Sequence, residues 1–222
     1  MFDKSLFIYD EETHTGLYEG SVVPSITQLI SVIYPMSEDI STQNLENASN
    51  RGTEIHKWIK KVNKVTVAYG KNNPAYNSNI KEVINYYRLT KAYHLVADSC
   101  EETVFLLDEN GDLIAYGHYD QVLKVVEPTE GIFETKGEFI MSDNKTVSSY
   151  SDDKVKLQTE MYRTAYRQCF NDKISDRTCG IHIRDDIANI HIYNETRTDA
   201  EVIEFAKFML KLWKEKQDER WS

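Results

Sequence analysis

The chain has 222 residues, of which 41% are hydrophobic and 28% charged, and its formal net charge is −10. This composition is typical of a globular domain with a sizeable core and argues against wholesale disorder. No apolar run approaches the roughly 20 residues of a membrane helix, and the acidic N-terminal segment lacks the pattern of a secretion signal. The negative charge argues against a passive nucleic-acid coat protein, because such proteins neutralise many phosphates with basic residues.

The N-terminal part is predicted to be mainly helical. Residues 6–18 read as an irregular or hairpin region, and a helix is expected to begin at Pro24 or Ser25, where serine is a favoured N-cap. Further expected elements are a polar stretch at 37–50, a helix at 52–67, a loop at 69–79 and a helix at 80–96.

After residue 98 the hydrophobic period changes to that of strands. The expected elements are strands at 103–107 and 114–126 around a turn at 108–112, a third strand at 131–136, a mobile polar loop at 137–153, a helix at 154–169, a hairpin formed by 178–184 and 188–193, and a final helix at 199–216. This pattern predicts one α/β domain over 1–222, with a helical N-terminal part (1–98) and a core (99–222) built on a mixed β-sheet flanked by helices.

Acidic residues and a lysine are expected at one edge of that sheet. Asp120 lies in the second predicted strand, and Glu134 and Lys136 share one face of the third because strand side chains alternate. Carboxylates brought together in this way repel one another unless a divalent cation binds them. The backbone carbonyl of Thr135 could join such a site, and Lys136 could stabilise the charge that develops on a reacting phosphate.

Three further features could complete the site. Gln158 and Tyr162 are one helical turn apart and share a face, although a surface glutamine and a core tyrosine would give the same pattern. His56 lies on an early helix and could ligate a metal, although a lone helical histidine is more often structural. Glu102, or alternatively Glu101, precedes the first strand and could supply another carboxylate.

In this order and spacing the residues resemble the PD-(D/E)XK nuclease superfamily, and within it the RecB-like exonucleases. The matching segments are Gly52 to His56, Glu102 (or Glu101), Gly117 to Asp120, Glu134 to Lys136 and Gln158 to Tyr162. The segment from Pro24 to Leu29 is also similar to one in phage nucleases and mitochondrial genome maintenance exonucleases. The resemblance covers roughly residues 20 to 215 and implies a restriction-endonuclease-like core.

The resemblance implies a Mg²⁺- or Mn²⁺-dependent DNA exonuclease that acts on single strands or free ends. His56, Asp120, Glu134, the Thr135 carbonyl and Glu102 would bind the metal, Lys136 would be catalytic, and Gln158 and Tyr162 would position the DNA or the lysine. Tyr86 and other aromatic residues of the helical part could stack on the strand. A structure-specific or restriction-like endonuclease and a non-catalytic binding module on the same fold remain alternatives.

The cysteines and the basic residues bear on partners and location. Three widely spaced cysteines predict reduced thiols in the cytoplasm and no iron–sulfur cluster, which needs four ligands. A partner protein from recombination, repair or replication is possible, and no membrane is expected. Two basic clusters could bind DNA or could simply be solvated helix faces: Lys57, Lys60, Lys61 and Lys64, and Lys154, Lys156, Arg163 and Arg167.

Overall fold

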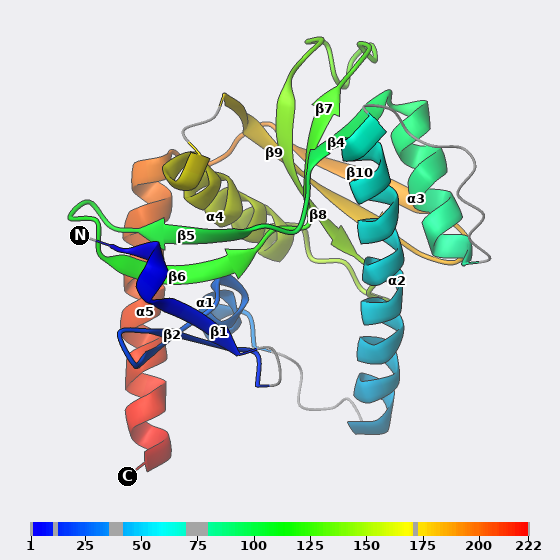
Figure 1. Ribbon diagram of the computed structural model, residues 1–222. Coiled ribbons are helices and arrows are strands. Elements are labelled where there is room, and N and C mark those ends of the chain that lie inside the picture. The colour runs from blue at the N-terminus through cyan, green and yellow to red at the C-terminus, as the bar shows by residue number, and fades with distance from the viewer. Residues whose placement is uncertain (1, 11–12, 36–41, 70–79, 171–172, 222) are drawn as a thin grey trace.

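The computed structural model describes residues 2–10, 13–35, 42–69, 80–170 and 173–221, and it has an α/β fold (Figure 1). Its elements are β1 (Phe7–Asp10), β2 (Thr15–Tyr18), β3 (Ser21–Val23), α1 (Ile26–Ile33), α2 (Thr42–Tyr69), α3 (Lys81–Ala92), β4 (Leu95–Ser99), β5 (Thr103–Leu107), β6 (Leu113–His118), β7 (Gln121–Val125), β8 (Phe139–Lys145), α4 (Asp152–Phe170), β9 (Ile174–Ile183), β10 (Ala188–Tyr193) and α5 (Asp199–Trp221). None of these helices has the length and apolar character needed to cross a membrane.

The central sheet has five strands in the order β10-β9-β8-β7-β4. All neighbours are antiparallel except β8 and β9, which run parallel and are joined by α4. A parallel pair requires such a crossover connection, so α4 lies against the two strands that it links. Two smaller sheets, β1-β2-β3 and the β5-β6 hairpin, complete the fold. The predicted mixed sheet flanked by helices is therefore confirmed.

Each face of the central sheet has its own helical cover and its own core. Helices α1, α4 and α5, together with the β5-β6 hairpin, pack around Val122 and Met141 on one face. Helices α2 and α3 pack on the other face, around Leu123 and Ile140. Figure 1 shows α2 and α5 on opposite sides of the molecule, with the sheet between them. Side chains that alternate along β7 and β8 therefore enter two different environments.

The prediction of a third strand at 131–136 is wrong. Residues 131–136 form a turn between β7 and β8, in which Phe133 is buried and Glu134, Thr135 and Lys136 are exposed. The strand itself, β8, is at 139–145, inside the stretch for which a mobile loop is predicted. It reads as polar because Ser142, Asp143 and Asn144 occupy a central strand and yet are buried. A hydrophobic pattern cannot identify such a strand.

Several predicted boundaries also differ. Helix α2 begins at Thr42, ten residues before the predicted start. The helix expected at 80–96 is divided into α3 and β4, and the strand expected at 114–126 is interrupted at Tyr119 and Asp120. The N-cap at Ser25 is confirmed, because its side chain and that of Gln28 form a reciprocal capping box. Most of the loop predicted at 69–79 lies outside the described residues.

A buried arginine fixes the start of α5. Arg163, on α4, is fully buried, and its guanidinium donates to the carbonyl oxygens of Asp176 and Arg197 and pairs with Asp199 at 3.3 Å. Arg167, one turn along, also binds Asp199. These two arginines of the second basic cluster are therefore structural and do not face solvent as a DNA-binding surface.

Replacing Arg163 with methionine should destabilise the protein by about 1–3 kcal/mol, because the carbonyl oxygens of Asp176 and Arg197 lose this donor and the partly exposed Asp199 loses a charged partner. Chemical denaturation of the parent and variant measures this free energy of unfolding. Replacing the partly exposed Lys156 with methionine serves as the control and should change stability by no more than about 0.5 kcal/mol. An Arg163→Met variant as stable as this control would contradict the structural role.

Candidate active site

Two aspartates meet where β7 begins and β8 ends. Gln121 is paired with Ser142, so Asp120, which directly precedes β7, lies opposite Asp143. The backbone N–H of Asn144 donates to Asp120 Oδ2 over 2.7 Å and holds that carboxylate at the strand end. Asp143 and Lys145 alternate with Ser142 and Asn144, so both project from the face that α4 covers. The site is thus built from adjacent antiparallel strands.

Asp143 is buried and forms an ion pair with Lys145. Its side chain is 4% exposed, and Lys145 Nζ lies 2.5 Å from Asp143 Oδ2. The Lys145 ammonium is thus the partner of this buried oxygen. A metal ion that bound Oδ2 would share the oxygen with Lys145 or displace the ammonium from it.

The electrostatics of the site follow from burial and from the proximity of the two acids. Burial and the charge of Asp120 raise the pKa of Asp143 to about 6. Burial also acts on Asp120, but the charges of His56 and Lys145 outweigh it and hold the pKa of Asp120 below its usual value. Burial opposes the charged form of Lys145, yet the two aspartates raise its pKa, so the ammonium is retained. In the metal-free protein Lys145 is therefore a cation.

His56 approaches the carboxylates from α2. Its Nδ1 lies 3.6 Å from Asp120 Oδ1. Burial disfavours the charged imidazole, but the charge of Asp120 prevails and raises the pKa of His56. Gly52, one turn earlier, lets α2 pass close to the end of β8, because a Cβ there would lie 3.0 Å from Thr146 Oγ1. The close approach thus gives a steric reason for the glycine of the Gly-x-x-x-His segment.

Glu101, and not Glu102, is the extra carboxylate near the site. Lys60 Nζ on α2 lies 3.3 Å from Glu101 Oε2, and burial together with the charge of Asp120 raises the pKa of Glu101. Its φ of 58° is unusual for a residue other than glycine. Glu102 is exposed and lines a groove with Lys4 and Tyr9, so assigning it to the metal site is wrong.

Gln158 and Tyr162 lie beneath the site. Both are buried on α4, and Gln158 Nε2 donates to the Tyr162 hydroxyl over 3.3 Å. The Tyr162 ring covers Gly117, where a Cβ would lie 2.5 Å from a ring carbon. The glycine of the Gly-x-x-Asp segment therefore makes room for the tyrosine of the Gln-x-x-x-Tyr segment. Their burial suits support of the strand ends better than direct contact with DNA.

Replacing Gly117 with alanine should destabilise the protein by about 1–3 kcal/mol, because the new methyl group overlaps the Tyr162 ring. Thermal or urea unfolding measures the loss. The matched control is the double variant Gly117→Ala with Tyr162→Leu, in which the alanine should add little to the cost of Tyr162→Leu alone. Equal costs of the alanine with and without the ring would show that the clash is not the cause.

The predicted acid-x-Lys at 134–136 is far from Asp120. The turn containing Glu134, Thr135 and Lys136 connects the end of β7 to the start of β8, whereas Asp120 and Asp143 lie at the other end of the same strands. The seven residues of β8 separate the two ends by about 20 Å. Assigning metal binding to Glu134 and Thr135 and catalysis to Lys136 is therefore wrong. Asp143-Asn144-Lys145 repeats the same acid-x-Lys spacing and could have been found from the sequence.

The donor atoms of the site suit a hard divalent cation. Asp120 and Asp143 present two neighbouring carboxylates. The Asn144 carbonyl faces the same side as its N–H, since paired strand residues direct both groups to one neighbour. Within the described residues, no three His, Cys, Asp or Glu side chains form a complete metal cage. Mg²⁺ does not require one, because it is commonly held by one or two carboxylates and keeps several waters.

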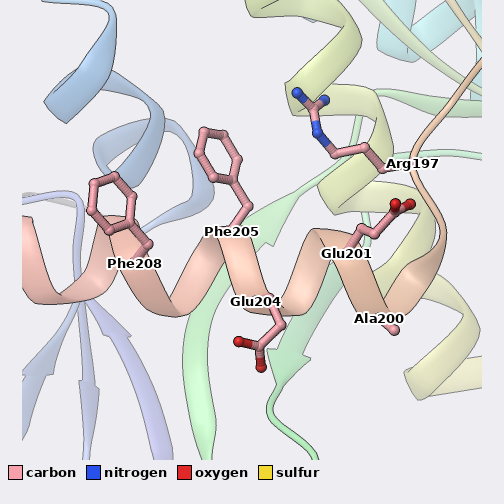
Figure 2. A pocket seen from close by; sticks show the side chains of 6 residues that line it. All are labelled: Arg197, Ala200, Glu201, Glu204, Phe205 and Phe208. Atoms are coloured by element: carbon pink, nitrogen blue, oxygen red, sulfur yellow. The ribbon is translucent and has the colours of Figure 1, made fainter.

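A separate surface hollow lies on α5, away from these carboxylates. Phe205 and Phe208 project from the helix with Arg197 on the same side, and Glu204 points the other way (Figure 2). The two rings stack with centroids 6.2 Å apart. The hollow contains none of the site residues. Its lining combines the two rings and Ala200 with three charged side chains, Arg197, Glu201 and Glu204.

Comparison with known proteins leaves the family undetermined. No family model and no curated protein matches the chain. Among solved structures, the chain is similar to one titled "Crystal structure of SSO0001", with a TM-score of 0.37 and 12% identity over 84% of each chain. A similarity at this level carries no argument about function, so the function is inferred from the site.

Proposed function

We propose that this chain is a metal-dependent deoxyribonuclease that hydrolyses phosphodiester bonds at DNA ends or in single strands. The observation that carries the proposal is the group formed at adjacent strand ends by the buried Asp143 and the partly buried Asp120 and Lys145. The burial of Asp143 next to a second carboxylate disfavours the charged form of Asp143 and does not help folding. The three groups are favourable for a site that must bind a cation and a phosphate together.

Each residue has a role in this proposal. Asp120, Asp143 and the Asn144 carbonyl would hold Mg²⁺ or Mn²⁺, with His56 and Glu101 at the margin. The bound metal would polarise the phosphate and supply a water of lowered pKa. Lys145 would neutralise the negative charge that develops on the reacting phosphate. Lys57 and Lys61, exposed on α2, would attract the DNA backbone towards the site.

Location and partners are part of the same proposal. Cys100, Cys169 and Cys179 are unpaired thiols. This suits a reducing compartment, and we place the protein in the cytoplasm. Its substrate there would be DNA with free ends, and a recombination, repair or replication protein could deliver it.

Linear single-stranded DNA, linear duplex and covalently closed circles, each with Mg²⁺ or Mn²⁺, would test the activity. The proposal expects degradation of the linear molecules and little cutting of closed circles. Equal cutting of closed circles would favour the endonuclease alternative. No cutting of any DNA with either metal would contradict the nuclease.

A further inference from the structure

A network of five polar side chains lies behind the site, on the opposite face of β7 and β8. Its members come from four elements and are at most 3% exposed: Asn63 on α2, Tyr86 on α3, Gln121 on β7, and Ser142 and Asn144 on β8. This placement also corrects the expectation that Tyr86 could stack on DNA, because its ring is buried in the core.

Gln121 is the centre of this network. Its Oε1 accepts from Asn63 Nδ2 at 2.5 Å and from the Tyr86 hydroxyl at 2.7 Å. Its Nε2 donates to Ser142 Oγ at 3.3 Å and to Asn144 Oδ1 at 3.2 Å. The Tyr86 hydroxyl also lies 2.9 Å from Asn63 Oδ1. Both helices on this face are therefore linked to both strands of the site.

Stability alone does not explain such a network. It is surrounded by apolar residues of the α2–α3 core, including Ile59 and Leu123. Replacing paired buried polar groups with apolar groups of the same shape is often neutral or stabilising. A buried hydrogen-bond network instead favours one geometry, because each member must stay in place for the others to remain bonded. The network therefore specifies how α2 and α3 sit on the strands.

Each end of this network is next to a residue of the site. Gln121 follows Asp120, and Ser142 and Asn144 flank Asp143. On α2, Asn63 lies two turns after His56 and one turn after Lys60, so the three share one side of the helix. The same helix side thus contacts the network, Glu101 and Asp120.

We propose that Asn63, Tyr86 and Gln121 are positioning residues that set the distance between α2 and the two aspartates. They hold His56 against Asp120 and Lys60 against Glu101, and so keep the cation site formed before metal or DNA binds. The catalytic consequence of this inference rests on the proposed nuclease function. Its geometric part does not, since it concerns the placement of His56 in the protein alone.

Asn63→Leu, which keeps the size and removes the polar link, is the main test. We expect a 10–100-fold loss in cleavage rate and in Mn²⁺ affinity measured by calorimetry, the range for residues that orient metal ligands. The KM for a short oligonucleotide should change little. Tyr86→Phe and Gln121→Met should act in the same direction. The matched control is Ile59→Val on the same buried side of α2, which disturbs packing but not the network.

Two further measurements separate positioning from general damage. In a His56→Ala background, Asn63→Leu should lower the rate by a much smaller factor, because residues that act through one another are not additive. In the metal-free protein, Asn63→Leu should move the His56 imidazole NMR resonances, whereas Ile59→Val should not. If Asn63→Leu does not fold, Tyr86→Phe, which removes a single hydroxyl, replaces it in the comparisons with Ile59→Val and in the His56→Ala background.

Two results would overturn the inference. One is an Asn63→Leu variant within twofold of Ile59→Val in both rate and Mn²⁺ affinity. The other is an equal loss with and without His56. If the parent protein cuts no DNA, the nuclease proposal fails, and Mn²⁺ affinity and the NMR shifts still decide whether the network positions the site.

Discussion

Lys145→Met is expected to lower the rate of DNA cleavage by about 10²–10³-fold, the loss typical for removal of one group that stabilises developing charge. The charge of Lys145 is retained because Asp143 and Asp120 raise the pKa of its ammonium. Methionine has a similar length and no charge. Single-turnover cleavage of a linear oligonucleotide in Mn²⁺ measures the chemical step directly.

Lys136→Met provides the matched control, because it removes the same charge from the other acid-x-Lys segment. Lys136 is exposed in the turn between β7 and β8, and its loss should leave the rate within about twofold. A variant of Lys136 that loses activity while Lys145→Met cuts normally would reverse the assignment made here. Lys145→Arg should restore only part of the rate, since the wider guanidinium does not fit where a compact ammonium sits.

Asp143→Asn is expected to abolish both cleavage and stabilisation by metal. A cation at about 100 times its Kd stabilises the folded state by about 2.7 kcal/mol. For a chain of this length each kcal/mol corresponds to about 2–4 °C, so Mg²⁺ or Mn²⁺ should raise the Tm of the parent by roughly 5–10 °C. Asp143→Asn and Asp120→Asn should show little of this increase. Glu134→Gln, which lies in the exposed turn, is the control and should respond like the parent.

The increase in Tm should also depend on pH. The pKa of Asp143 is raised to about 6, and a metal must displace the proton before it binds. The stabilisation by metal is therefore expected in full well above pH 6 and should be lost as pH falls through that value. Without metal, the raised pKa acts the other way: the Asp143 contribution to stability falls as pH rises from about 4 to 6. A metal effect of equal size at pH 5 and pH 8 would contradict the role of Asp143.

The sequence was sufficient to predict the fold class and part of the site. Asp120, His56, Gln158 and Tyr162 were predicted from the resemblance of their order and spacing to the PD-(D/E)XK nucleases, and the structure brings Asp120 close to His56 and Gln158 close to Tyr162. Asp143 and Lys145 were not predicted, because buried strand residues are usually apolar, whereas the buried residues at the end of β8 are polar. Its last residues are polar and buried, because side chains of α2, α3 and β7 form a hydrogen-bond network with them. Such tertiary partners are not visible in a local pattern.

The choice between the two acid-x-Lys segments shows the same limit. Glu134-Thr135-Lys136 follows Ile132 and Phe133 and has the profile of a strand end, whereas Phe133 in fact anchors a turn in the core. Only the register of β7 on β8 distinguishes them, because it places residue 143 opposite Asp120. A register is set by pairing along the whole strand, so no short window of sequence contains it.

The alternation along β8 makes the chain unequally tolerant of insertions. Ser142 and Asn144 belong to the network, and Asp143 and Lys145 belong to the site on the other face. A single residue inserted between Phe139 and Ser142 would reverse the faces of the following side chains. Asp143 and Lys145 would then point towards the network, and Ser142 and Asn144 towards the site. The exposed turn at 134–136 precedes β8 and lies one strand length from the site, so residues added there do not shift the alternation of side chains along β8. A peptide tag or a fluorophore could therefore be added there without changing the register on which the site depends.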